Sequence, residues 1–212
     1  MSLNAIAYPT PPLTSPAGRL VALHGWGSNA QDLASLAPYL NLAEYQFLFP
    51  NGPMPHPQAP SGRMWYDLAD FATRKGLPES RQMLTDLMLS LDNSDSSAPS
   101  VHIPLNKTIL AGFSQGGAMT LDVGTHLPVA GLVVLSGYLH PLEVRPLPKI
   151  FPPILMIHGR QDNVVQIAIA RKSHEALVEA GATVEYHELD MGHEIQPEAM
   201  ALIQNFVQQQ SR

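Results

Sequence analysis

Short runs of Val, Ile and Leu, bounded by glycine or proline, recur along the chain. Most of them lack the alternation of apolar and polar positions that a half-exposed strand would show. Such runs are typical of strands covered on both faces, as in a parallel sheet. The expected strands are residues 19–24, 45–49, 107–113, 131–135, 154–158 and 183–189.

Helical spacing of apolar residues fills the gaps between these strands. Residues 84, 87, 88 and 91, all Leu or Met, step i, i+3, i+4, i+7, and so do positions 199, 202, 203 and 206. Further helices are expected over residues 31–40, 115–126 and 166–180. Strands alternating with helices predict an α/β fold with a mostly parallel, helix-flanked sheet. In such sheets the functional residues follow the carboxyl ends of the strands.

Two stretches are expected to be irregular loops. Residues 50–62 are rich in proline, which excludes regular hydrogen bonding, and residues 92–104 are rich in Ser, Asp and Pro. Neither stretch connects the sheet to a second segment large enough to form its own core. The 212 residues are therefore expected to form a single domain, 1–212.

Composition excludes several classes of partner. The formal net charge of −6 argues against nucleic acid and against docking on anionic membranes. The longest apolar runs are too short for stable membrane insertion. The absence of cysteine rules out disulfides and thiol catalysis, and suits a cytoplasmic protein. The expected partner is a neutral or apolar small molecule.

The most informative motif is Gly-Phe-Ser-Gln-Gly-Gly at residues 112–117, which closes an expected strand and opens an expected helix. A G-x-S-x-G sequence in that context predicts a nucleophile elbow carrying Ser114. Positions 112 and 116 must lack side chains there, because the helix and a neighbouring strand pass close by. The helix also directs its positive end at the site, which favours developing negative charge. The alternative is a plain turn in which Ser114 caps the helix.

A serine nucleophile needs a base and a group that orients the base. Among nine histidines, His193 lies between the last expected strand and the last expected helix. Asp162 follows the strand 154–158 and is the candidate acid, although an Asp there could simply form an Asx turn. Asp190 is a rival acid, but it shares a loop with His193. The chain order Ser114, Asp162, His193 is the order expected of an α/β hydrolase.

Residues 23–28, Leu-His-Gly-Trp-Gly-Ser, follow an early strand and predict an oxyanion hole. Acyl transfer needs backbone N–H groups directed at the oxyanion that forms during attack. One N–H is expected from Gln115, directly after the nucleophile, and the second from Trp26. The alternative is an ordinary turn at a strand end.

These motifs together resemble those of the phospholipase/carboxylesterase family, small α/β hydrolases that include acyl-protein thioesterases. The resemblance covers residues 20–206 and includes Trp65-Tyr66-Asp67, similar to an element near the family's substrate groove. The alternative for these three residues is a buried aromatic pair with a capping Asp. The resemblance implies serine carboxylesterase activity without metal or cofactor. Many members carry an acidic residue where this chain has Ser28, so the resemblance implies the reaction type and not the thioesterases' protein substrates.

The substrate site is expected to be a shallow groove. The stretch 136–153 is short and rich in proline, and leaves no room for the helical cap domain of larger lipases. The residues expected to contact an ester or acyl-chain substrate are Trp65, Tyr66, Tyr138 and Met191, with Trp26 and Met119 as further candidates. An apolar surface beside the groove would also suit a second subunit, which leaves a homodimer open.

Three other functions compete with the carboxylesterase. A peptidase or a lactone hydrolase could use the same triad, because leaving-group preference depends on pocket shape. A non-catalytic ligand-binding module could keep the fold, although such a chain would be free to lose Ser114, Asp162 or His193. A metal hydrolase is disfavoured, because the sequence contains no H-x-H or H-x-x-x-H pair.

Overall fold

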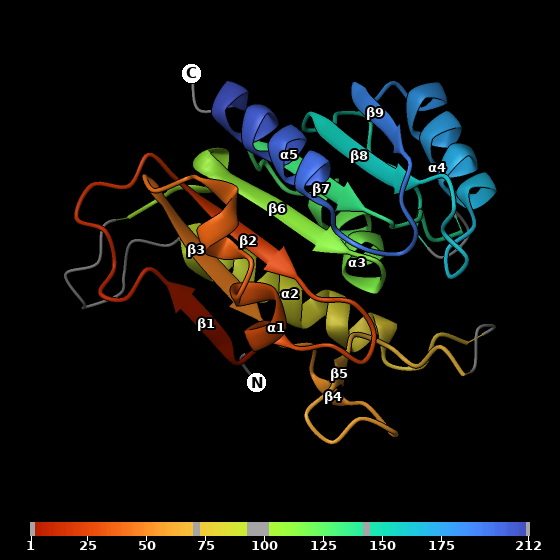
Figure 1. The fold of residues 1–212 in the computed structure, drawn as a ribbon, viewed down its shortest axis with the longest axis horizontal. Helices are drawn as coiled ribbons and strands as arrows, with labels where there is room; N and C mark the ends of the chain where they lie inside the picture. The colour runs from red at the N-terminus through yellow and green to blue at the C-terminus, as the bar shows by residue number, and fades with distance from the viewer. Residues whose placement is uncertain (1–2, 70–72, 93–101, 142–144, 211–212) are drawn as a thin grey trace.

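A seven-stranded, mostly parallel sheet forms the centre of the protein (Figure 1). The computed structural model describes residues 3–69, 73–92, 102–141 and 145–210. Strand order is β1-β3-β2-β6-β7-β8-β9, and only β1 pairs in the antiparallel sense. The strands are β1 Ala5–Tyr8, β2 Gly18–Leu23, β3 Tyr45–Pro50, β6 Thr108–Phe113, β7 Gly131–Leu135, β8 Ile154–Gly159 and β9 Val184–Leu189.

Helices cover both faces of this sheet. On one face lie α1, the 3₁₀ helix η1 and α5, and on the other α2, α3 and α4. In Figure 1, α1 and α5 lie in front of the sheet and α2 and α3 behind it. Their bounds are α1 Ala30–Ala34, η1 Ala37–Leu40, α2 Leu77–Asp92, α3 Gln115–Gly124, α4 Ile167–Glu179 and α5 Pro197–Gln210, with a second 3₁₀ turn, η2, at Leu105–Lys107.

The two apolar cores explain why the predicted strands lack alternation. In β2, Leu20 and Ala22 pack into one core while Val21 and Leu23 pack into the other. Every residue of β2, β7 and β8 is buried. Apolar side chains are therefore needed on both faces, as the sequence pattern indicated. The fold is that of an α/β hydrolase.

Several local predictions differ from the structure. The antiparallel edge strand β1 was not predicted. Its residues, Ala-Ile-Ala-Tyr, are an apolar run of only four positions, and most of them are exposed. Within the proline-rich stretch, β4 (Met54–Pro55) pairs with β5 (Arg63–Met64), so that stretch is not wholly irregular. The helix expected over 31–40 is two short helices, with Pro38 at the start of η1. The expected loop 92–104 falls largely on residues outside the described part of the chain.

Nothing in the described structure covers the carboxyl ends of the strands as a helical cap domain would. Between β7 and β8, residues 136–141 and 145–153 form neither helix nor strand. No helix among the described residues has both the length and the apolar character to cross a membrane.

Candidate active site

The turn from β6 to α3 has the backbone geometry of a nucleophile elbow. Ser114 adopts φ 54° and ψ −116°, a strained conformation for a residue with a side chain. A Cβ at Gly112 would come within 2.2 Å of the Gly116 carbonyl oxygen, and one at Gly116 within 2.2 Å of the Leu23 carbonyl oxygen. Only glycine fits at either position. Ser114 takes the N-cap position of α3, yet its side chain makes no capping hydrogen bond.

Asp162 and His193 are in direct contact. The imidazole Nδ1 of His193 lies 2.7 Å from Oδ2 of Asp162. The other carboxylate oxygen, Oδ1, accepts the backbone N–H groups of Val164 at 2.9 Å and Val165 at 2.8 Å. The Asx-type turn predicted as an alternative therefore coexists with the histidine contact. It holds the carboxylate so that Oδ2 is aimed at the imidazole.

The environment of Asp162 keeps its carboxyl group ionised. Burial opposes ionisation, but the hydrogen bonds from His193 and from the two amides outweigh it and lower the pKa of Asp162. With the carboxylate as acceptor, Nδ1 of His193 carries a proton and donates it. Nε2 of a neutral imidazole is then free to accept a proton.

Close backbone packing brings these two loops together. A Cβ at Gly159, the last residue of β8, would come within 2.3 Å of the Met191 carbonyl oxygen, so the loops carrying acid and base approach as closely as glycine allows. The N–H of Gln161 also donates to the Met191 carbonyl at 3.1 Å. The rival acid, Asp190, is exposed and pairs instead with Arg160 at 2.6 Å.

The histidine also contacts the nucleophile's own strand. The rings of Phe113 and His193 lie 4.8 Å apart between centroids. Because Phe113 directly precedes Ser114, this contact places the imidazole beside the elbow. The loops after β6, β8 and β9 thus bring all three predicted triad members to the carboxyl edge of the sheet.

The loop after β2 also lies against the elbow. A Cβ at Gly25, the residue before Trp26, would be 3.4 Å from the Ser114 Cβ. His24 fastens this loop, because its Nδ1 donates to the Gly25 carbonyl at 2.8 Å and its Nε2 accepts the Gly52 N–H at 2.9 Å. Burial lowers the pKa of His24, which favours the neutral imidazole that this pattern requires.

Trp65 and Tyr66 brace the site rather than line it. Gln115 bonds this segment with its whole side-chain amide: Oε1 accepts the Trp65 N–H at 2.9 Å, and Nε2 donates to the Tyr66 carbonyl at 2.7 Å. The indole N–H of Trp65 donates to the His24 carbonyl at 3.0 Å. Both side chains are fully enclosed. Trp65 and Tyr66 thus connect Gln115, the first residue of α3, to His24 in the loop after β2.

The expected substrate contacts therefore need correction. Trp65, Tyr66, Met119 and Met191 are all at most 2% exposed, so their side chains present no surface to a groove. An aromatic pair next to a catalytic loop looks the same in sequence whether it faces a ligand or the core. Of the four residues first expected to touch substrate, only Tyr138 lies on a surface hollow.

A hollow of about 180 Å³ opens beside the nucleophile. Apart from Ser114 and Gln115, its walls are apolar or aromatic: Leu68, Tyr138, Val164, Val165 and Ile169. Sequence reasoning missed the aliphatic members. The available signal was the apolar pair Val164-Val165 just after Asp162. The structure leaves Val164 69% exposed, and Ile169 in the following helix is 45% exposed. Exposed apolar side chains beside a reactive serine suit an acyl chain.

A family model for phospholipase/carboxylesterase proteins matches residues 10–211. The chain belongs to the phospholipase/carboxylesterase family. This membership identifies it as a hydrolase that acts on ester bonds.

Named relatives of this family member support the same assignment. Acyl-protein thioesterase 1 from Neurospora crassa is 29% identical over 228 residues, which cover 93% of this chain and 90% of the relative. Lysophospholipase-like protein 1 from Mus musculus is 24% identical, with coverage of 92% and 89%. The crystal structure of esterase PE8 superposes with a TM-score of 0.84 at 26% identity, over 99% of both chains.

Proposed function

We propose that this family member is a serine carboxylesterase that hydrolyses carboxylic esters, with thioesters as a second substrate class. The observation that carries the proposal is the hydrogen bond from His193 Nδ1 to Asp162 Oδ2 beside a serine in elbow geometry. In this arrangement the acid holds the tautomer that lets Nε2 accept the serine proton. Ser114 is the nucleophile, His193 the base and Asp162 the orienting acid.

The reaction proceeds through an acyl-enzyme. Ser114 Oγ attacks the carbonyl carbon as its proton passes to His193 Nε2, and the carbonyl oxygen becomes an oxyanion. The backbone N–H groups of Gln115 and Trp26 bind that oxyanion, each contributing about 3 kcal/mol. The alcohol or thiol leaves with the proton from His193. Water then attacks the acyl-enzyme with the same base, releasing the carboxylic acid and restoring Ser114.

The hollow beside Ser114 takes the acyl chain. Its aliphatic walls, Leu68, Val164 and Ile169, favour a hydrocarbon over a charged group. A group the size of a water molecule needs about 10–15 Å³. The hollow of about 180 Å³ therefore holds on the order of ten groups of that size. That is room for an acyl chain of several carbon atoms. Relatives named acyl-protein thioesterase support an acyl substrate here.

The test is hydrolysis of p-nitrophenyl esters of increasing acyl length by wild type and Ser114→Ala, together with labelling by a fluorophosphonate. Wild type should turn over and be labelled, and the variant should do neither. The matched control is Ser90→Ala, an exposed serine on α2 whose hydroxyl donates to the Leu87 carbonyl of the same helix, and it should behave as wild type. Equal activity or labelling of Ser114→Ala would overturn the proposal.

A further inference from the structure

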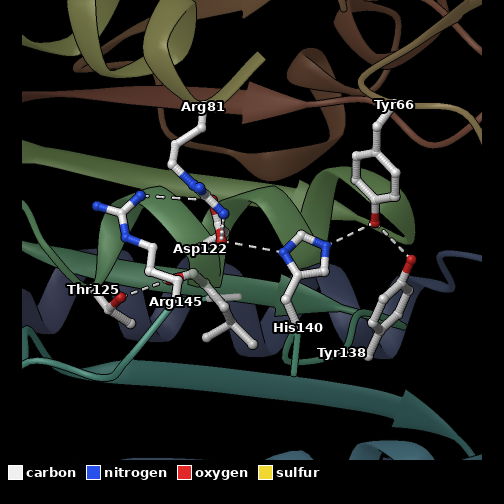
Figure 2. Close-up of polar contacts among 8 residues, drawn as sticks. Tyr66, Arg81, Asp122, Thr125, Tyr138, His140 and Arg145 are labelled. Atoms are coloured by element: carbon white, nitrogen blue, oxygen red, sulfur yellow. Dashed lines mark hydrogen bonds and ion pairs between the residues drawn. The ribbon is translucent and has the colours of Figure 1, made fainter. Parts of the chain in front are cut away.

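A chain of hydrogen bonds leads from the hollow into the protein interior (Figure 2). The hydroxyl of Tyr138, which lines the hollow, lies 2.7 Å from the hydroxyl of Tyr66. That hydroxyl lies 2.9 Å from Nε2 of His140, and Nδ1 of the same ring lies 3.2 Å from Oδ1 of Asp122 on α3. None of the four residues belongs to the catalytic triad.

Asp122 is a fixed negative charge at the inner end of the chain. Arg81 on α2 donates to both carboxylate oxygens, at 2.7 and 2.9 Å, and Arg145 approaches at 3.7 Å. Burial works against ionisation of Asp122, but the hydrogen bonds from His140 and Arg81 outweigh it and lower its pKa to about 2. The carboxylate can therefore only accept hydrogen bonds.

With a neutral imidazole, this fixed acceptor sets the direction of the bonds that follow. His140 then donates from Nδ1 to Asp122 and accepts at Nε2. Tyr66 donates to that nitrogen, so its oxygen accepts the proton of Tyr138. Burial raises the pKa of both phenols, so each keeps the proton that the chain requires. The proton of Tyr138 thus points inward, and the ring is held in one orientation.

We propose that Tyr66, His140 and Asp122 are positioning residues that hold the Tyr138 ring as a fixed wall of the acyl groove, and so set the preference for acyl-chain length. The inference rests on the proposed hydrolysis at Ser114. Tyr66 is fully enclosed and does not line the hollow, so it acts on a substrate only through Tyr138. Without the bond, the Tyr138 ring can change rotamer and reshape the wall.

The experiment measures kcat and KM for p-nitrophenyl acetate, butyrate, hexanoate and octanoate. Tyr138→Phe and Tyr66→Phe should both raise KM for the octanoate by about three- to tenfold, the equivalent of one neutral hydrogen bond. Tyr66→Phe should leave KM for the acetate and kcat for every ester within about twofold, because a two-carbon acyl group does not reach the wall and the triad is untouched. His140→Asn keeps a donor for Asp122 but cannot reach Tyr66, and should give the same profile.

Two comparisons separate positioning from a loss of general stability. The double variant Tyr66→Phe/Tyr138→Phe should have the same KM for the octanoate as either single variant, because each single variant already loses the bond between the two hydroxyls. Tyr186→Phe is the matched control. It removes a tyrosine hydroxyl that donates to Glu188 on β9 and takes no part in the hydrogen-bond chain from Tyr138 to Asp122, so its KM values for the four esters should equal those of wild type. Thermal melts show which variants are folded at the assay temperature.

The outcomes separate the inference from the function it rests on. A folded Tyr66→Phe or His140→Asn with the wild-type length profile would overturn the positioning role, as would an equal change in KM for all four esters. In either case hydrolysis by wild type would still support the proposed function. If wild type hydrolysed none of the esters, both proposals would fail.

Discussion

At the residue scale, two aspartates compete for the role of orienting acid. Asp162 has one oxygen bound by two backbone amides and the other directed at His193. Asp190 is an exposed partner of Arg160. Both follow strands at the same edge of the sheet, but Asp190 shares a loop with His193. The burial and the hydrogen-bond partners favour Asp162 as well.

Replacing the acid should remove catalysis while leaving substrate binding. Asp162→Asn would favour the imidazole tautomer that cannot accept the serine proton, and kcat should fall by about 10⁴ with KM little changed. Asp190→Asn should keep wild-type kcat. Steady-state kinetics on one p-nitrophenyl ester measures both variants. A loss in Asp190→Asn as large as that in Asp162→Asn would reverse the assignment.

At the residue scale, the sequence indicates which side chains follow a strand but not which side chains are buried. Ser114, Asp162 and His193 each follow a strand whose apolar run is visible in the sequence, so their placement at one edge of the sheet could be inferred from topology, while their catalytic roles stay predictions. Whether Trp65 and Tyr66 face a ligand or the core depends on the segment that covers them. The side chain of Gln115 bonds the backbone of both residues from about fifty positions further along the sequence. A contact between such distant residues leaves no local sequence pattern.

Strands buried on both faces were the most predictable elements. The six predicted strands appear within one residue of their expected bounds. For β2, β6, β7 and β8 the composition is set by two cores rather than by one, whereas β9 is a partly exposed edge strand. Strand β1 is an exposed edge, and its antiparallel pairing with β3 depends on backbone hydrogen bonds that no side-chain pattern encodes. The β4–β5 pair was missed because its prolines suggested a loop.

The ion pair between α2 and α3 should make stability depend on pH. The pKa of Asp122 is lowered from 3.8 to about 2, so its contribution to stability is complete above pH 4 and is lost as the pH falls towards 2. By linkage that contribution is about 2 kcal/mol. Asp122→Asn should therefore unfold at lower urea concentration at pH 7, and its deficit should shrink as the pH falls from 4 towards 2.

Urea unfolding curves at pH 7 and pH 3 measure this effect. The control is Asp86→Asn, an exposed carboxylate on α2 that accepts a hydrogen bond from Gln82 of the same helix, and its stability should stay close to wild type. If Asp122→Asn lost no stability at pH 7, or if its deficit grew on acidification, the ion pair would not stabilise the contact between the two helices.

At the scale of the whole molecule, the site is assembled from four loops that a parallel sheet brings to one edge. The loops after β2, β6, β8 and β9 carry Trp26, Ser114, Asp162 and His193, the residues proposed as oxyanion donor, nucleophile, acid and base. Sequence could predict this assembly because strand direction alone decides which loops meet. It could not predict the groove walls, since Leu68 and Ile169 come from segments without a motif and meet only in the folded chain. The cytoplasmic location and the homodimer stay predictions.

The net charge of the protein should change kcat/KM for an anionic ester relative to that for a neutral ester. A formal net charge of −6 lowers the local concentration of anionic substrates at low ionic strength, and added salt screens that repulsion. For an ester whose acyl chain ends in a carboxylate, kcat/KM should rise by about twofold as salt increases from 10 mM to 300 mM. A neutral ester of equal chain length should change little, and it controls for general salt effects on the enzyme. A fall in kcat/KM for the anionic ester alone would indicate that a positive local potential at the groove outweighs the net charge, and would favour anionic substrates instead.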